Sequence, residues 1–300
     1  MPNVLLTSAG RRVALLRAFR AAVASVGGGR VLAADAGGTA AAIHEADEGF
    51  VVPTIDPELP VLARSREAFA RAGVLVAASG PATNDIAFDK ANTAAFFDRE
   101  GIPAPRQLDL GGAVAGRNGF AFPVALKPRF GSGSVGVHIV RELDELRFYA
   151  RRVPEPLLQE YVEGVEFTLD VLVGPDGRAA CVVPRRRLET RAGEISKGYT
   201  VRDAEIEEWG RLVCERLPDA AGPLTLQCFR RRDGRLAFIE INPRFGGGFP
   251  LSLHAGADYP RWLLEWALGL PSTASPEAWR ADVAMLRYDD AIFVSREALA

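Results

Sequence analysis

The sequence predicts an α/β protein with a parallel, Rossmann-like sheet in its first third and hairpin-rich structure in the remainder. Short apolar runs in the first third alternate with Ala-rich helical patterns, and this β–α–β alternation is typical of parallel sheets. Later apolar runs are joined by glycine-rich or Asp-Gly turns, which favour antiparallel hairpins. The expected parallel strands are 4–6, 31–34, 50–53 and 73–77, and the expected helices are 12–26 and 59–72.

The first third also carries two features that are typical of anion or nucleotide sites. The turn at Ser8–Arg12 precedes a helix, whose N-terminus could bind an anion, but it lacks the G-x-G-x-x-G pattern. Asp35 ends the second expected strand, where a dinucleotide-binding fold has its ribose-binding acid; we interpret this single acid as structural. A turn-rich segment follows at 79–85, and a helix is expected over 86–100.

Composition and charge exclude several classes of protein. The 300 residues have a formal net charge of −2 and are 48% hydrophobic, which supports a sizeable core and suggests neither a nucleic-acid nor a membrane partner. No metal spacing joins Cys181, Cys214 and Cys228, and their scattered arrangement favours a reducing compartment. No signal-peptide pattern or membrane-length apolar run is present. We therefore expect a cytoplasmic protein.

The most informative segment is a predicted hairpin near the C-terminus. Asp233–Gly234 lies between two apolar runs, and this dipeptide favours a two-residue turn. If Arg232 pairs with Arg235, counting outward in antiparallel register places Gln227 opposite Glu240. The two side chains are then expected on one face of the sheet.

Asn242 extends this polar patch. It lies two positions after Glu240, and side chains two positions apart on a strand share a face of the sheet. Carboxylate and amide oxygens suit Mg²⁺, and the guanidinium of Arg244, just beyond, suits a transferring phosphoryl group. The alternative is the solvent face of an ordinary hairpin. Apolar neighbours make the strand hydrophobic on both faces, so its carboxylate needs a partner or a metal. The hairpin therefore predicts a metal–nucleotide site with Gln227 as its third ligand.

A glycine-rich loop lies between two expected strands. The strand over 122–126 ends in Lys127, and the segment over 135–140 also has a strand pattern. Three glycines between them satisfy G-x-G-x-x-G: Gly131, Gly133 and Gly136. A Rossmann loop must open a helix, so we interpret this segment as a hairpin flap whose backbone N–H groups approach phosphates. A solvent-exposed turn beside a snorkelling lysine is the alternative. The segment after the flap, over 157–166, is suited to offer backbone groups to an adenine edge and a carboxylate to ribose hydroxyls. Taken alone, it is equally an amphipathic strand followed by a turn.

Taken together, these motifs resemble the ATP-grasp superfamily, particularly its carbamoyl-phosphate-synthase-like branch, over nearly the whole chain. The resemblance implies a Rossmann-like pre-ATP-grasp domain over 1–85 and a two-part α+β ATP-grasp domain over 86–300, with a flap at about 118–158. It implies ATP and Mg²⁺ as cofactors, with Mn²⁺ as a substitute, and it makes a homodimer a reasonable expectation. The chain has one such module, whereas a carbamoyl phosphate synthetase large subunit has two.

The resemblance also assigns roles to individual residues. Lys90 and Lys127 stand where the family's two phosphate-binding basic residues occur. Glu166 stands at its ribose-binding acid, and Arg244 matches the arginine that holds the phosphoryl intermediate. The adenine-binding strand is matched by Gln159, Glu160, Tyr161 and Val162. The metal ligands are matched by Gln227, Glu240 and Asn242.

The function implied is that of an ATP-dependent ligase. Such an enzyme phosphorylates a small-molecule carboxylate, and an amine then attacks the acyl phosphate, so that ADP and phosphate are released. Two alternatives stay open: a carboxylate or carbamate kinase that performs no ligation, and a non-catalytic ATP-binding module. For the substrate, Arg187, Arg191 and Lys197 could bind an anion, although a solvated loop explains this cationic segment equally well. His254 could face the acceptor site.

Overall fold

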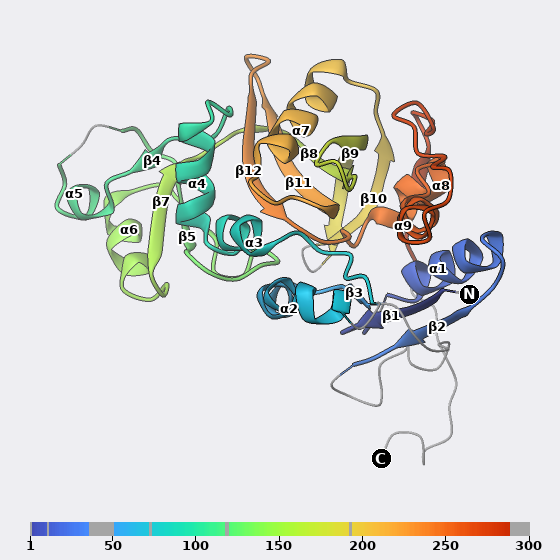
Figure 1. Cartoon of the computed structure of the whole chain (residues 1–300). Coiled ribbons are helices and arrows are strands. Elements are labelled where there is room, and N and C mark those ends of the chain that lie inside the picture. Colours follow the sequence, from blue (N-terminus) through green and yellow to red (C-terminus); the bar gives the residue numbers. More distant parts are fainter. Residues whose placement is uncertain are drawn as a thin grey trace, which may run out of the picture.

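The computed structural model describes residues 2–10, 12–35, 51–71, 74–117, 120–191 and 194–288, which form one parallel and two antiparallel sheets (Figure 1). The predicted α/β fold class is confirmed. In Figure 1 the N-terminal sheet lies below the six-stranded central sheet, and the four-stranded lid sheet extends to the left. Among the described residues, no helix is long and apolar enough to cross a membrane.

The N-terminal sheet is parallel and has the strand order β2–β1–β3, as the alternating pattern predicted. Its elements are β1 (Asn3–Thr7), α1 (Val13–Ser25), β2 (Arg30–Ala33), β3 (Val51–Pro53), the 3-10 helix η2 (Asp56–Glu58) and α2 (Leu59–Arg71). Asp35 accepts a hydrogen bond from the backbone N–H of Gly10 at 2.9 Å, which agrees with a structural role. The strand expected over 73–77 is wrong for its described part. There Val76 forms an isolated bridge and packs on Leu59, so burial in a loop explains the apolar run.

The single helix expected over 86–100 is also wrong. Two helices, α3 (Pro81–Phe88) and α4 (Lys90–Arg99), meet at Asp89, whose backbone is extended at φ −108° and ψ 112°. The Asp89 carboxylate accepts a hydrogen bond from the N–H of Ala91 and thereby caps α4. This break places Lys90 at the first position of α4, and α3 spans residue 85, the expected domain boundary.

The lid sheet has the order β4–β7–β5–β6 and is antiparallel throughout. Its elements are β4 (Gln107–Leu108), α5 (Leu110–Val114), β5 (Val124–Pro128), β6 (His138–Val140), α6 (Leu143–Ala150) and β7 (Pro156–Glu160). The predicted flap hairpin is confirmed as β5–β6. However, the strand expected from residue 135 begins only at His138, because Ser134 and Gly136 adopt positive φ angles of 61° and 73° and prolong the turn.

The central sheet has the order β12–β11–β8–β9–β10–β13, and all its neighbours are antiparallel. Its strands are β8 (Gly164–Val173), β9 (Ala179–Arg191), β10 (Glu194–Thr200), β11 (Gly222–Arg231), β12 (Leu236–Asn242) and β13 (Ala284–Leu286). Helix α7 (Ala204–Arg216) packs on β8 and β9, and Cys214 and Val213 of this helix join a core with Leu169 and Leu226 of the sheet.

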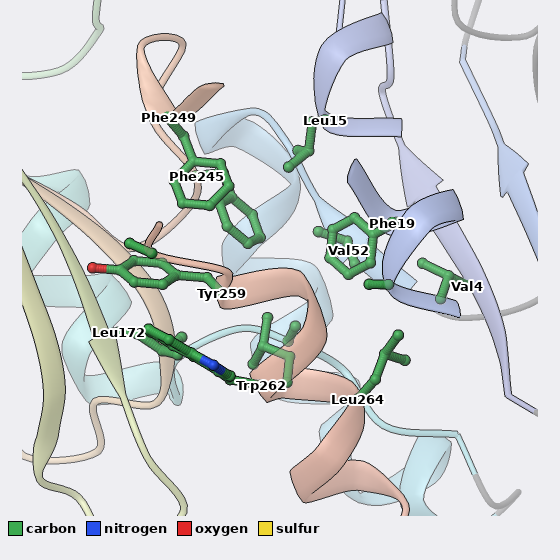
Figure 2. Packing of buried hydrophobic residues seen from close by; sticks show 14 of the residues in the cluster. Val4, Leu15, Phe19, Val52, Leu172, Phe245, Phe249, Tyr259, Trp262 and Leu264 are labelled. Atoms are coloured by element: carbon green, nitrogen blue, oxygen red, sulfur yellow. The ribbon is translucent and has the colours of Figure 1, made fainter. Parts of the chain in front are cut away.

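The N-terminal and central parts share one hydrophobic core. Helices α8 (Phe249–Ala255) and α9 (Tyr259–Ala267) lie between them, and Figure 2 shows their aromatic side chains beside those of α1. Phe245 packs edge-on against Phe19 at 5.9 Å and against Phe249 at 4.7 Å between ring centroids. Because Phe245 directly follows Arg244 in the sequence, this core fixes the backbone beside a predicted functional residue.

Candidate active site

The β11–β12 hairpin aligns the three predicted metal ligands. Gln227 pairs with Glu240 and Thr225 pairs with Asn242, which confirms the register expected from the sequence. All four side chains line the same cavity. The hairpin therefore presents a carboxylate and two amides on one surface.

The turn of this hairpin differs from the expected one. The backbone N–H of Arg231 donates to the carbonyl of Arg235, and the N–H of Gly234 donates to the carbonyl of Arg231, so the loop has three residues. Gly234 adopts the left-handed φ of 86° that such a loop requires. This change alone would shift the register by one residue. A bulge opposite Gln227 and Cys228, with Ile239 as the additional residue, restores the pairing of Glu240. Because of the bulge, Ile239 and Glu240 both face the site.

Three adjoining cavities meet at Glu240, which lines all of them. The first, here called the flap cavity, lies between the lid and central sheets and is lined by Lys127, Gln159, Tyr161, Val162, Glu166 and Gln227. The second, the polar cavity, is lined by Arg12, Asp56, Arg185, Arg187, Arg244 and Gly248. The third, the apolar cavity, is lined by Leu59, Ala87, Phe88, Ile239 and Ile241. A group held at Glu240 can thus touch ligands in the flap and polar cavities at once.

Two lysines reach the flap cavity from different elements. Lys127 lies on β5 and is 9% exposed, and Lys90 of α4 donates a hydrogen bond to the carbonyl of Gly131 in the flap. Burial lowers the pKa of Lys127 to about 8; the carboxylate of Glu240 opposes this shift and Lys90 adds to it. Burial also lowers the pKa of Lys90. In both lysines burial outweighs the nearby carboxylates, and a bound polyphosphate would favour the charged forms again.

The strand expected to contact adenine lies in the lid. Gln159, Tyr161 and Val162 all line the flap cavity. Glu160 borders it too, but its carboxylate is held by Arg231 at 2.6 Å, and this hydrogen bond lowers its pKa. The side chain of Glu160 thus ties the lid to the central sheet, which leaves backbone groups of this strand to meet a ligand.

Glu166 and Arg187 form an ion pair between the flap cavity and the polar cavity. Burial raises the pKa of Glu166, while the charge of Arg187 and its hydrogen bond oppose that shift. The predicted ribose-binding acid and a predicted substrate-binding cation are therefore neighbours. A ligand that engages one of them changes the charge balance of the other.

Arg244 forms a bidentate ion pair with Asp56 of η2. The Nε–Oδ1 distance is 2.6 Å and the Nη2–Oδ2 distance is 2.9 Å, and both side chains are largely buried. Bidentate geometry fixes the plane of a guanidinium. The orientation of Arg244 is thus set by a residue of the N-terminal part, 188 positions away in the sequence.

Some predicted site residues lie apart from this constellation. Gly131 and Gly133 line the flap cavity, but Gly136 packs against Pro128 instead. The cationic segment is a β9–β10 hairpin and not a loop, so only Arg187 of the three expected cations lines the polar cavity. Arg191 is exposed at the end of β9, and Lys197 pairs with Glu189 at 2.7 Å across the hairpin. His254, the predicted acceptor-site residue, lies on α8 and does not line the polar cavity.

Two residues of the site were not expected from the sequence. Asp56 lies in a short segment without any motif, and only the folded chain brings it to Arg244. Arg185 belongs to the cationic run, and a strand assignment would have found it, because Arg185 and Arg187 are two apart and share a face.

The donor set fits Mg²⁺ that arrives with a nucleotide. Gln227, Glu240 and Asn242 offer one charged and two neutral oxygen donors, and no group of three or more His, Cys, Asp or Glu residues that could hold a metal occurs in the described ranges. Mg²⁺ is typically bound by one or two carboxylates together with substrate phosphates and water. These residues would hold the ion only weakly without phosphate oxygens.

Two family models match this chain. Residues 152–291 match the family model described as ATP-grasp in the biosynthetic pathway with Ter operon, and residues 4–56 match the model of the PylC-like N-terminal domain. The chain thus carries an ATP-grasp domain after a PylC-like N-terminal domain, and the predicted resemblance is confirmed.

Individual relatives agree with this assignment. A carbamoyl-phosphate synthase of Methanobrevibacter smithii is 28% identical over 144 residues, covering 47% of this chain and 39% of the relative. A D-alanine–D-alanine ligase of Aquifex aeolicus is 26% identical over 132 residues, covering 40% and 45%. The chain thus spans less than half of the length of either relative. The biotin carboxylase structure from Campylobacter jejuni shares the fold, with a TM-score of 0.72 and 16% identity over 94% of this chain and 74% of that one.

Proposed function

We propose that this protein is an ATP-dependent ligase that joins a small-molecule carboxylic acid to an amine. The observation that carries the proposal is the position of Glu240, where the flap cavity meets the polar cavity. A nucleotide in the first cavity would direct its terminal phosphate toward an acid in the second. The names of the curated relatives support this reaction class, since one of them is a ligase of two amino acids.

The flap cavity suits the nucleotide. Lys127 and Lys90 would neutralise phosphate oxygens, and the β7 backbone would meet the adenine edge. When bound, Mg²⁺ would offset phosphate charge and act as a Lewis acid toward the phosphoryl group. Gln227, Glu240 and Asn242 would hold it.

The reaction follows from the chemistry of a carboxylate, which resists attack because oxide is a poor leaving group. An oxygen of the acid attacks the γ-phosphorus of ATP, the bond to the β-phosphate oxygen breaks, and ADP leaves. The amine nitrogen then attacks the acyl carbon, the C–O bond to phosphate breaks, and the amine loses a proton. Arg244 would stabilise the charge on the transferring group, and positioning would supply most of the acceleration.

No protein nucleophile is needed. Burial raises the pKa of Cys181 and of Cys228 to about 12, and it raises that of Cys214 as well, so these thiols stay protonated. The flap over the cavity would exclude water from the acyl phosphate when the nucleotide is bound.

The test is ADP release across a panel of small carboxylic acids, each assayed with and without amines. Release that requires both partners, with formation of an amide, supports ligation. Release with the acid alone would favour a kinase without ligation, and Mg·ATP binding without release under any condition would favour a non-catalytic module.

A matched pair of variants ties the activity to the site. Glu240→Gln should lower kcat by about 100-fold or more, because it removes the charged donor where the cavities meet. Glu208→Gln is the control, since that carboxylate is half-exposed on α7 and, within the described residues, forms an ion pair with Arg211 alone. Equal activity of the two variants would overturn the assignment.

A further inference from the structure

Among the described residues, Arg185 is the largest side chain that is completely buried, yet it lines the polar cavity. It lies on β9 and is 1% exposed. A buried guanidinium is costly unless its charge is paired and its hydrogens are bonded. The partners of its three nitrogens therefore indicate what this side chain does.

Two of the three nitrogens are occupied by Asp170. Nε donates to Oδ2 at 2.7 Å and Nη2 donates to Oδ1 at 2.9 Å, while the Ser252 hydroxyl also donates to Oδ2. Across the described parts of the chain, Nη1 has no hydrogen-bond partner. Asp170 thus balances the charge of Arg185 and fixes its plane, but it leaves one pair of N–H donors unused.

Gly248 of the glycine loop at 246–248 lies directly against this nitrogen. A Cβ on Gly248 would lie 2.1 Å from Nη1 of Arg185, and a Cβ on Gly246 would lie 2.9 Å from Oγ1 of Thr225. The backbone of Gly248 is ordinary for any residue, at φ −90° and ψ 0°. Space for the guanidinium, and not backbone conformation, therefore requires glycine here.

More arginines than carboxylates line the polar cavity. Four arginines line it, whereas Asp56 and Glu240 are the carboxylates that do so in the described residues. Asp170 and Glu166, which balance two of these arginines, do not line it. Arg185, Arg187 and Arg244 are each paired with a carboxylate. The reason to expect an anion is therefore the pair of unused Nη1 donors of Arg185, with which a carboxylate would form charge-assisted hydrogen bonds.

We infer that Nη1 of Arg185 binds a carboxylate that is not phosphorylated in the reaction. This inference rests on the proposed ligase function and deepens it. The activated acid must reach Glu240 and Arg244, so an anion at Arg185 is a second acidic group in the same cavity. One of the two substrates therefore carries an additional carboxylate.

Two substrates could supply this carboxylate. An amino acid acceptor would anchor its carboxylate at Arg185 while its amine attacks, and a dicarboxylic donor would anchor one acid while the other is phosphorylated. Comparing the KM of amino acids with that of their carboxamides tests the first source. Comparing the KM of dicarboxylic acids with that of their monoamides tests the second. Each comparison removes one negative charge and changes the shape of the ligand little.

Arg185→Lys is the informative variant, because an ammonium can keep the pairing with Asp170 but cannot also supply the Nη1 donors. We expect the KM of the carboxylate-bearing substrate to rise about tenfold or more, while the KM values of its carboxamide analogue and of Mg·ATP stay unchanged. Gly248→Ala should weaken the same preference by displacing Nη1, with the guanidinium still present. Equal effects on the carboxylate and carboxamide forms in Arg185→Lys, or no effect, would overturn the inference.

A binding measurement separates this inference from the proposed function. The measurement is calorimetric titration into protein saturated with Mg²⁺ and a non-hydrolysable ATP analogue, and it needs no turnover. The ligands are an amino acid and its carboxamide, and a dicarboxylic acid and its monoamide. A preference for the carboxylate that Arg185→Lys abolishes supports the site even if no amide product forms. Absence of any preference in the unmodified protein would refute it.

Discussion

Nucleotide binding should take up protons at alkaline pH, because burial holds the pKa of Lys127 at about 8 instead of 10.5. At pH 8.5 such a group is about one quarter protonated. A triphosphate beside it would return its pKa to about 10.5 or above, so binding would take up about 0.7 protons from this residue. At pH 6.5 the uptake by Lys127 should be close to zero.

The same linkage sets the direction of the affinity change. The charged form binds phosphate, so affinity for Mg·ATP should fall about tenfold between pH 7 and pH 9. Without nucleotide, burial of the charged lysine lowers the free energy of unfolding by about 3 kcal/mol below pH 8. Between pH 8 and 10.5 the unfolded chain binds more protons than the folded one, so this penalty is relieved as pH rises.

The assay is isothermal titration calorimetry of Mg²⁺ with a non-hydrolysable ATP analogue, in buffers of different ionisation enthalpy at pH 6.5 and 8.5. Lys127→Arg is the control, since a guanidinium stays charged at both pH values, and titration of the nucleotide itself cancels in the comparison. Lys90 also takes up protons on nucleotide binding, because its pKa is lowered too. Lys127→Arg should therefore lose only the part of the proton uptake that belongs to Lys127. Equal proton uptake by both proteins at pH 8.5 would refute the reasoning.

Three further outcomes follow from the contacts of the site and the core. Asp56→Asn weakens the contact that fixes the plane of the Arg244 guanidinium, so kcat should fall about tenfold or more with little change in the KM of Mg·ATP. Steady-state ADP release measures both constants, and a change confined to the KM would contradict this role of Asp56. Asp170→Asn leaves Arg185 buried without its counter-charge, so the free energy of unfolding in urea titrations should fall by about 3 kcal/mol. A loss below about 1 kcal/mol would contradict the presence of a buried ion pair between the two residues. Phe245→Ala should cost about 3–5 kcal/mol by the same method, and an unchanged midpoint would contradict the shared core.

The β11–β12 hairpin shows which part of the candidate site the sequence could predict. The pairing of Gln227 with Glu240 was predicted correctly although the turn was not, because the bulge at Ile239 compensates for the longer loop. The alternation of side chains constrains which residues share a face, and one buried face selects the register. The position of a bulge depends on packing against other elements, which a local pattern does not contain.

Predictions from local sequence patterns were wrong where a distant segment determines the conformation. The helix expected over 86–100 is divided by Asp89, whose carboxylate caps α4 and pairs with Arg129 of the flap region at 2.6 Å. The composition of the cationic run is equally compatible with a solvated loop, yet pairing with β10 makes β9 a strand. In both cases a distant segment decided the conformation.

The sequence by itself determined the α/β class, the pairing of Gln227 with Glu240, and the presence of two lysines and an arginine suited to phosphate. These properties depend on periodicity and residue chemistry over short stretches of chain. Only the tertiary structure decided that Asp56 orients Arg244 and that Arg185, which lines the polar cavity, keeps one nitrogen without a hydrogen bond in the described part of the chain. Charge pairing is a matter of distance in space, and these partners come from segments that no local period connects.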